Sequence, residues 1–248
     1  DTLRLLRGLQ ISDPSRIAVT CTRRRILLVL ARSGLVDLQG DGDSERIGRK
    51  EVEEVLESSV VQVDALRDSW PWKESPRLLV SRPPWLRIKD RFRGHLDGSE
   101  LRKKLSRSLR NTTESDGSKR FSALRGNVNL YRLYIERSLQ LVREGGKVRM
   151  IVPDTVLREK SSIALRKMIV EQNQWISSWW IPEPQRIFPG TSQGVSVIGL
   201  EVGGKTEMMT SFGPLRADDI STKTGLDNSS PFIEMERGPW SVWTDMTW

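Results

Sequence analysis

Apolar residues recur along the chain in two kinds of spacing, and their alternation predicts the order of the secondary-structure elements. Short apolar runs rich in β-branched or aromatic residues are typical of strands, and they lie at residues 3–11, 60–63, 77–80, 148–152, 175–181 and 195–202. Longer segments with apolar residues three and four positions apart predict helices, and they lie at residues 15–32, 127–143 and 161–172. Because strands and helices alternate, the sequence predicts an α/β fold with a mainly parallel sheet and helices on both faces.

The ends of the predicted strands gather polar and aromatic residues. In an open parallel sheet, ligands bind outside the carboxyl ends of the strands, which meet at one edge. The predicted strand ends carry residues 10–13, 64–66, 82–85 and 153–154. We therefore expect a binding site along that edge. The consecutive prolines Pro83 and Pro84 mark the end of one strand, since proline has no amide hydrogen for a sheet ladder.

The periodic pattern divides the chain into a main domain and a following segment. Residues 1–204 are predicted to form one α/β domain, with a basic insertion at about 87–125. Beyond the glycine pair that closes this domain the pattern breaks into short segments, which predicts that residues 205–248 begin a second module with target recognition as its candidate role. The chain does not start with methionine and its last stretch is apolar, so we expect it to be a piece of a longer protein.

Basic residues outnumber acidic ones, and many of them fall in one stretch. The chain has 40 Lys and Arg against 32 Asp and Glu, a net charge of +8. The basic residues of the insertion are Arg87, Lys89, Arg91, Arg93, Arg102, Lys103, Lys104, Arg107, Arg110, Lys119, Arg120 and Arg125. Such density favours binding to a phosphate backbone with release of counterions. A solvated, partly disordered insertion is the other interpretation, because small polar residues crowd positions 111–118.

The scarcity of Cys and His excludes several classes of site. With Cys21 as the one cysteine and His95 as the one histidine, the sequence offers no disulfide framework and no Cys/His zinc site, and no metal site is expected. It has no run of about 18 apolar residues, so no membrane-spanning helix is predicted. The first residues do not resemble a signal peptide. A reducing, cytoplasmic location is the expectation.

The tetrad Arg82-Pro83-Pro84-Trp85 resembles the catalytic loop of S-adenosylmethionine-dependent DNA adenine-N6 methyltransferases, which reads Asn/Asp-Pro-Pro-aromatic after the fourth strand. Other stretches resemble the large fused restriction–modification and phage-defence branch of that family. In chain order they are Gly126–Tyr131, Ile135-Glu136, Gly145–Val148, Ile151–Pro153 and Arg186–Phe188 with Ser192–Leu200. The ordered series is more specific than the tetrad, which alone is typical of a proline-rich turn.

The resemblance implies a Rossmann-like methyltransferase sheet and the transfer of a methyl group from S-adenosylmethionine to an adenine flipped out of the duplex. The tetrad would be catalytic, with Trp85 stacking on the flipped ring and Phe188 as the second wall of the base pocket. Asp64 would bind the adenine amine of the cofactor, and Gln10 stands about where the family has an acidic residue for the cofactor ribose. The implied DNA contacts in the basic insertion are Arg87, Lys89, Arg91, Arg93, Lys103 and Lys104.

The sequence departs from the family at positions that its chemistry needs. Arg82 occupies the Asn/Asp position, and a guanidinium has five donors and no acceptor, so it cannot accept hydrogen bonds from the adenine amine. Its charge would also oppose the positive charge that develops on N6. Gln10 is a neutral and therefore weaker partner for a ribose hydroxyl than a carboxylate, and Asp13 is the competing candidate, although Asp-Pro there is also typical of a helix start. No Gly-rich loop precedes these residues, which predicts a sheet without its first strand.

The sequence therefore resembles the family, but these departures oppose catalytic activity by this chain. The first hypothesis is a fragment or degenerate member of the DNA adenine-N6 methyltransferases that is inactive as this chain and does not bind S-adenosylmethionine. The second is a non-catalytic DNA-binding or specificity subunit on the same scaffold, in which Trp85 stacks on an extruded base. A methyltransferase for RNA or protein glutamine is a third, and the basic insertion counts against it. The expected partners are double-stranded DNA and further domains or subunits of a restriction or defence system, with no membrane.

Overall fold

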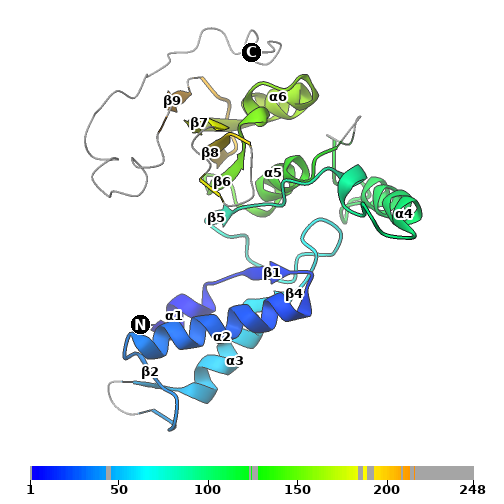
Figure 1. The fold of residues 1–248 in the computed structure, drawn as a ribbon. Helices are drawn as coiled ribbons and strands as arrows, with labels where there is room; N and C mark the ends of the chain where they lie inside the picture. Colours follow the sequence, from blue (N-terminus) through cyan, green and yellow to red (C-terminus); the bar gives the residue numbers. More distant parts are fainter. Residues whose placement is uncertain are drawn as a thin grey trace. The chain divides into compact units, whose positions relative to one another are not determined.

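The computed structural model divides the chain into two compact units, residues 1–74 and 75–248, which are drawn in Figure 1 and described here one at a time. The residues that the structure describes are 2–42, 46–122, 124, 128–183, 187–188, 193–207, 209–212 and 215. The predicted second module over 205–248 lies mostly outside the described residues and stays a prediction. In the described part, no helix is long and apolar enough to cross a membrane, and no group of three or more His, Cys, Asp or Glu side chains is arranged to hold a metal ion.

The first unit combines three helices with two short parallel strand pairs. Its elements are α1 (Thr2–Arg7), β1 (Ile11–Asp13), α2 (Arg16–Arg32), β2 (Val36–Asp37), β3 (Ile47–Gly48), α3 (Arg49–Ser59) and β4 (Val60–Gln62). Strand β1 pairs in parallel with β4, with Ile11 opposite Val60, and β2 pairs in parallel with β3. The core of the unit lies between the helices and includes Val52 and Leu56 of α3, which are 0% and 1% exposed.

The start of the chain is a helix, although its sequence predicted a strand over residues 3–11. Leu3 and Leu6 are three positions apart and therefore share one face of a helix, and both pack against the core of the unit. The Ser59 hydroxyl donates a hydrogen bond of 2.9 Å to the Leu6 carbonyl at the end of this helix. Packing against α3 thus decides the conformation of a segment whose own apolar pattern fits either element.

Helix α2 begins two residues later than the pair Asp13-Pro14 suggested. Ser15 is its N-cap and accepts a hydrogen bond of 3.3 Å from the Ala18 amide. The Asp13 carboxylate accepts instead from the Ser15 amide at 2.7 Å and stabilises the turn before the helix. Further along, the Arg23 guanidinium donates two hydrogen bonds, of 2.9 and 2.7 Å, to the Val60 carbonyl and so joins α2 to β4.

The second unit contains the larger sheet. Its elements are β5 (Leu78–Ser81), η1 (Ile88–Asp90), α4 (Gly98–Asn111), α5 (Leu130–Leu141), β6 (Lys147–Pro153), η2 (Asp154–Leu157), η3 (Lys160–Ser162), α6 (Ile163–Gln172), β7 (Asn173–Ile181), β8 (Val195–Val202) and β9 (Thr210–Phe212). Five of these strands form one sheet in the order β5-β6-β8-β7-β9. The tetrad therefore follows the first strand of this order rather than a central strand.

The fold class is α/β and the five-stranded sheet is mainly parallel, as the sequence predicted, with β8 as its one reversed strand. Strands β5 and β6 pair in parallel, as do β7 and β9, whereas β8 is antiparallel to both β6 and β7. Strands that run in the same direction need a long crossover, usually a helix, and α6 connects β6 to β7, which lie on either side of β8. No helix of the described residues separates β7 from β8, so β8 runs back and inserts between them.

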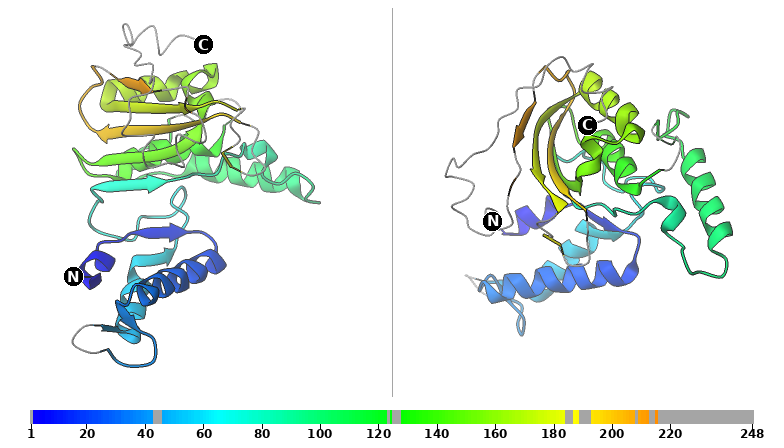
Figure 2. Two further views of the ribbon diagram at one scale, coloured as in Figure 1. Left: turned by 60° about the vertical axis from the view of Figure 1, so that its left-hand side comes forward. Right: turned by 45° about the horizontal axis from the view of Figure 1, so that its top comes forward.

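Helices α5 and α6 lie on the same face of the five-stranded sheet (Figure 2), where the sequence predicted helices on both faces. Val148, Met150 and Val152 of β6 alternate onto that face and are almost fully buried. They form one apolar core with Ile135 of α5 and Ile169 of α6. The opposite face of β6 carries Ile151, which packs in a separate aromatic cluster near the end of the strand.

The turns after β6 are held by a buried cation. Arg166 of α6 is fully buried and donates hydrogen bonds to the Val156 and Glu159 carbonyls at 2.9 and 3.0 Å. Burial lowers the pKa of the Arg166 guanidinium to about 10, because the apolar surroundings disfavour its charged form. These bonds fix η2 and η3, and with them the residues that follow the carboxyl end of β6.

The basic insertion is folded in its described part, so the disordered alternative is wrong there. Its two ends meet, since Ile88 donates a backbone hydrogen bond to Val128 at 3.1 Å and Leu130 donates one to Leu86 at 3.0 Å. Helix α4 is anchored by Leu109, which is 1% exposed. Arg120, a basic residue of the insertion, is buried and forms an ion pair of 2.6 Å with Glu114. Glu114 also binds Arg137 of α5 at 2.9 Å.

We expect Leu56→Ala to destabilise the first unit by about 2–5 kcal/mol, because the truncated side chain leaves a cavity in a well-packed core. The measurement is amide hydrogen exchange in α2 and α3, which should accelerate correspondingly. Leu5→Ala is the matched control, since Leu5 is 74% exposed in α1 and its truncation should change protection by less than about 0.5 kcal/mol. Equal effects of the two substitutions would contradict the assigned core.

Candidate functional site

The tetrad leaves the sheet at the carboxyl end of β5, next to the end of β6. The ladder between β5 and β6 pairs Leu78 with Lys147 and ends with Ser81 opposite Met150, because Pro83 and Pro84 have no amide hydrogen to continue it. The Trp85 indole Nε1 then donates a hydrogen bond of 3.1 Å to the Ile151 carbonyl. This bond holds the aromatic side chain of the tetrad against the neighbouring strand.

Trp85 and Phe188, the two residues that the resemblance assigned to a base pocket, lie close together. Their ring centroids are 5.7 Å apart and the rings meet edge to face at 77°, a favourable aromatic geometry. Both belong to a small apolar cluster with Ile151, Trp179 and Ile187. The cluster lies on the face of the sheet opposite α5 and α6, at the carboxyl ends of β5 and β6.

Arg82 covers the aromatic pair. Its guanidinium carbon lies 4.8 Å from the centroid of the Trp85 ring and 4.4 Å from that of Phe188, both within the range of cation–π attraction. A permanently charged group with donors only therefore sits against both rings that a stacked base would contact. The guanidinium occupies the position at which the resemblance places a hydrogen-bond acceptor.

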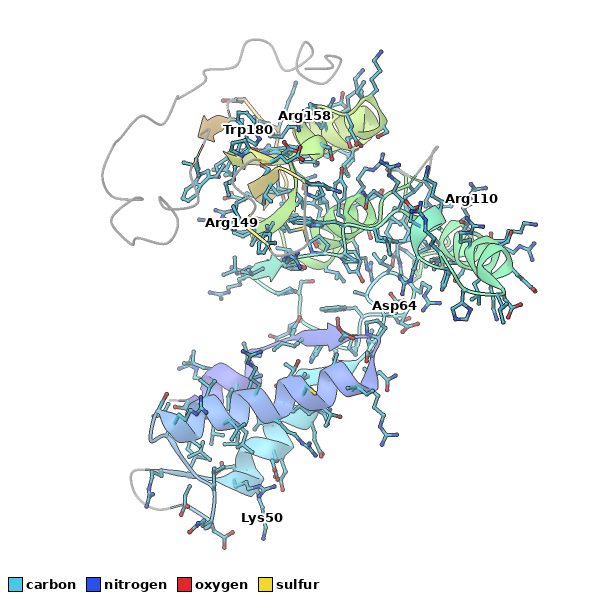
Figure 3. All side chains as sticks on the ribbon, viewed as in Figure 1. Lys50, Asp64, Arg110, Arg149, Arg158 and Trp180 are labelled. Atoms are coloured by element: carbon cyan, nitrogen blue, oxygen red, sulfur yellow. The ribbon has the colours of Figure 1, made fainter. Side chains whose placement is uncertain are left out.

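Asp154 is a buried carboxylate beside the same strand ends. Its side chain is 3% exposed, and its Oδ2 accepts hydrogen bonds from Arg158 at 2.5 Å and from the Trp180 indole at 3.1 Å. Figure 3 shows Arg158 and Trp180 near each other in the second unit. Gly194 leaves the room for this carboxylate, because a Cβ at that position would collide with Oδ2. Asp154 joins η2 to β7 and to the start of β8.

Gln10 and Asp64 belong to the first unit, where both side chains already have partners. The Gln10 amide donates to the Glu74 carbonyl at 2.8 Å and accepts from the Trp70 indole at 3.3 Å. The Asp64 carboxylate, labelled in Figure 3, pairs with Arg67 at 2.7 Å and accepts from the Leu66 amide at 3.0 Å. Asp64 thus stabilises a local turn, whereas Gln10 joins the segment before β1 to residues 70–74.

Three of the six expected DNA contacts come together in one pocket. A cavity of about 570 Å³ lies between η1 and α4 and is lined by Arg87, Ile88, Lys89, Ser99, Arg102, Lys103, Ser106, Arg107, Arg110, Asn111, Leu124 and Val128. Arg91, Arg93 and Lys104 do not line it. Arg93 instead forms an ion pair of 2.7 Å with Asp90.

The spacing of basic residues in the sequence could have indicated further cations of this pocket. Lys103, Arg107 and Arg110 follow each other at steps of four and three within residues 98–111, and Arg102 adjoins Lys103, so all four fit one helix face. The helical period of that segment therefore singles out three additional cations among many. The sequence placed Asp154 at a predicted strand end, but the contact of its carboxylate with Trp180 of β7 depends on the tertiary structure.

Comparison with known proteins adds a family and a fold. The family described as Eco57I restriction-modification methylase matches residues 11–188. The Type II methyltransferase M.TthHB8I of Thermus thermophilus is 32% identical over 87 residues, which are 35% of this chain and 19% of that protein. The DrdV–DNA complex matches 95% of this chain and 24% of DrdV, with a TM-score of 0.55 and 12% identity. The type IIG restriction endonuclease BpuSI matches 97% of this chain and 29% of its own, with a TM-score of 0.48 and 15% identity.

The chain covers only part of the length of the proteins that it matches. The chain spans about a fifth of M.TthHB8I and about a quarter of DrdV in the matched regions. At 12% identity the DrdV match concerns the fold alone, and its TM-score is consistent with the α/β architecture described above.

We expect Asp154→Ala to lower the free energy of unfolding by about 1–3 kcal/mol, because it leaves the Trp180 indole and the Arg158 guanidinium without their acceptor. Asp154→Asn keeps an acceptor oxygen for the indole and should cost less. Urea denaturation measures both. Asp90→Ala removes a carboxylate from a more exposed ion pair, with Arg93, and should cost about 0–1 kcal/mol. If Asp154→Ala cost no more than this control, the assigned role of the carboxylate would be wrong.

Proposed function

Because the chain belongs to the Eco57I restriction-modification methylase family, we propose that it is the methyltransferase-like part of a restriction–modification protein that acts on adenine N6 in double-stranded DNA. We further propose that the chain as it stands transfers no methyl group. The observation that carries both statements is the arrangement of Arg82, Trp85 and Phe188 at the carboxyl end of β5.

The aromatic pair supports the base pocket. A methyltransferase cannot reach an adenine amine inside the duplex, so it flips the base out and stacks it on apolar or aromatic side chains. Trp85 is fixed by its hydrogen bond to the Ile151 carbonyl, and Phe188 meets it edge to face. Such a rigid pair at the end of parallel strands suits a flat aromatic ligand. M.TthHB8I is a Type II methyltransferase by name, and DrdV was solved with DNA, which agrees with a DNA substrate.

Arg82 supports the loss of activity. The amine needs an acceptor that increases electron density on N6, whereas a guanidinium only donates. Its positive charge also opposes the charge that N6 acquires during transfer. Losing one well-placed polar group at a catalytic centre costs about 10²–10³ in rate, and a reversed polarity costs more. The Gln10 and Asp64 side chains already have hydrogen-bond partners within the protein, which supports weak binding of the cofactor as well.

A non-catalytic DNA-binding or specificity subunit on the same scaffold is the second candidate function. The contact of Arg82 with both rings favours it, because a cation over the rings is compatible with DNA binding while it opposes methyl transfer. The first candidate makes Arg82 the cover of the aromatic pair. The second has Trp85 of the wild-type chain stack on an extruded base, so the first experiment below distinguishes the two.

We expect Arg82→Ala to strengthen binding to a duplex that carries an extrahelical 2-aminopurine opposite an abasic site. Removing the guanidinium uncovers two ring faces, and stacking of one base on an aromatic side chain is worth about 1–3 kcal/mol, a change of roughly fivefold to a hundredfold in Kd. Fluorescence anisotropy measures the affinity for this duplex relative to a fully paired one. The wild-type chain should show no preference between the two.

The double variant Arg82→Ala/Trp85→Ala is the control, because it removes the same charge and one of the two rings. It should lose most of the preference that Arg82→Ala gains. A wild-type chain that already prefers the extrahelical base, or a gain that persists without Trp85, would rule out the covered base pocket.

We expect titration calorimetry of the chain with S-adenosylmethionine to give no binding in the micromolar range. The physical reason is that the polar atoms of Gln10 and Asp64 are committed to Glu74, Trp70 and Arg67. S-adenosylhomocysteine, which lacks the positive sulfonium charge, is the matched ligand and should also fail to bind. Micromolar binding of S-adenosylmethionine would overturn the proposed inactivity at the level of the cofactor.

A further inference from the structure

The pocket between η1 and α4 presents cations that form no ion pair with another described residue, and we propose that it binds consecutive backbone phosphates of double-stranded DNA. The proposal deepens the function proposed above and rests on it, because it assigns the DNA contact of the same protein to one defined surface. Its basis is the set of residues that line the pocket, which includes six Lys and Arg side chains and no carboxylate: Arg87, Lys89, Arg102, Lys103, Arg107 and Arg110. We name these six residues the phosphate row.

The phosphate row is built mainly by one face of α4. Of the six, four lie on this helix, and together with Ser99 and Ser106 they follow the three- and four-residue steps of a single face. From Ser99 to Arg110, labelled in Figure 3, the helix advances by about 16 Å at 1.5 Å per residue. Arg87 and Lys89 extend the same surface from the η1 segment.

The charges of the phosphate row are not neutralised within the described part of the chain. Lys103 and Arg107 are four positions apart on the helix, and such like-charged neighbours repel. The ion pairs recorded between described residues involve none of the six, whereas nearby Arg93 pairs with Asp90 and Arg120 with Glu114. The fold thus places carboxylates beside other cations of the insertion and leaves this face positive. A polyanion that binds there relieves the repulsion.

The pocket is held in shape by backbone and apolar contacts rather than by ion pairs. The Arg102 guanidinium donates to the Lys89 carbonyl at 3.0 Å and so ties α4 to η1. Ile88 and Leu109 are buried behind the cationic surface. At the start of α4, Gly98 allows a close approach to the Phe92 carbonyl that a Cβ would prevent. The cations therefore project from a fixed scaffold, which limits the entropy that binding would cost.

The dimensions favour a nucleic-acid backbone over a small anion. A cavity of about 570 Å³ corresponds to roughly 19 water molecules at about 30 Å³ each, which leaves room for hydrated phosphate groups. Phosphates follow each other every 3.4 Å of helix axis along one DNA strand, so a cationic row of about 16 Å can serve several of them in succession. The Ser99 and Ser106 hydroxyls and the Asn111 amide add neutral donors of the kind that contact phosphate oxygens.

The test compares two double variants of the whole chain that each remove one Lys and one Arg. Lys103→Gln/Arg107→Gln removes two charges from the phosphate row. Lys147→Gln/Arg143→Gln is the matched control, since both residues are exposed, and neither lines the pocket or belongs to the implied DNA contacts. Gln is a good helix former, so α4 should persist in both, and circular dichroism checks this. Arg102 is left intact because it holds α4 to η1.

Binding of a 20-base-pair duplex is measured by fluorescence anisotropy from 50 to 200 mM NaCl. Because log K falls with log salt by about 0.9 for each phosphate neutralised, the pocket variant should lose about 2 units of slope. The control variant should keep the wild-type slope. Equal losses in both variants, or an unchanged slope in the pocket variant, would overturn the inference.

The same measurement separates this inference from the proposed function. If the chain acts on DNA but the phosphate row does not bind it, the wild type and the pocket variant bind the duplex with the same salt slope. If the phosphate row binds DNA but the aromatic pair is not a base pocket, the slope of the pocket variant falls as expected, while Arg82→Ala gains no preference for the extrahelical base. Absence of DNA binding by the wild type at 50 mM NaCl would overturn both.

Discussion

The two prolines after β5 impose the constraint on which the candidate site depends. Without an amide hydrogen at Pro83 or Pro84, the ladder between β5 and β6 cannot continue past Ser81. The chain has to leave the sheet there, and the Trp85 indole supplies a new hydrogen bond to the Ile151 carbonyl of β6. The missing backbone donors thus end the strand, and the chain that follows presents an aromatic ring at the carboxyl edge of the sheet.

The described cations fall into two groups with different consequences. Some have acceptors inside the protein: Arg120 and Arg137 share Glu114, Arg158 binds Asp154, and buried Arg166 donates to carbonyls. These stabilise the insertion and the turns after β6. Arg82 and the phosphate row have aromatic faces, backbone carbonyls or open solvent around them instead. The first group explains how the unit folds, and the second supports a surface for DNA with a covered base pocket.

The mixed sheet shows how tertiary connections modify a local pattern. The apolar runs predicted most strands, including β8 with its observed bounds, since alternation and β-branched residues are properties of the segment itself. They did not give the direction of β8, which the structure shows to be antiparallel to both of its neighbours, β6 and β7. Helix α1 shows the same limit, because Leu3 and Leu6 fit a strand or a helix until the packing against α3 selects the helix.

The sequence by itself determined the α/β class, the positions of most elements, the tetrad and its resemblance to the methyltransferases, because all of these are encoded in residue type and spacing along one segment. Only the tertiary structure placed the Arg82 guanidinium over both Trp85 and Phe188, and only it separated the cations of the phosphate row from those that pair with carboxylates. Such relations join side chains from distant segments. Their distances depend on how separate elements pack, and no periodicity within a segment records that packing.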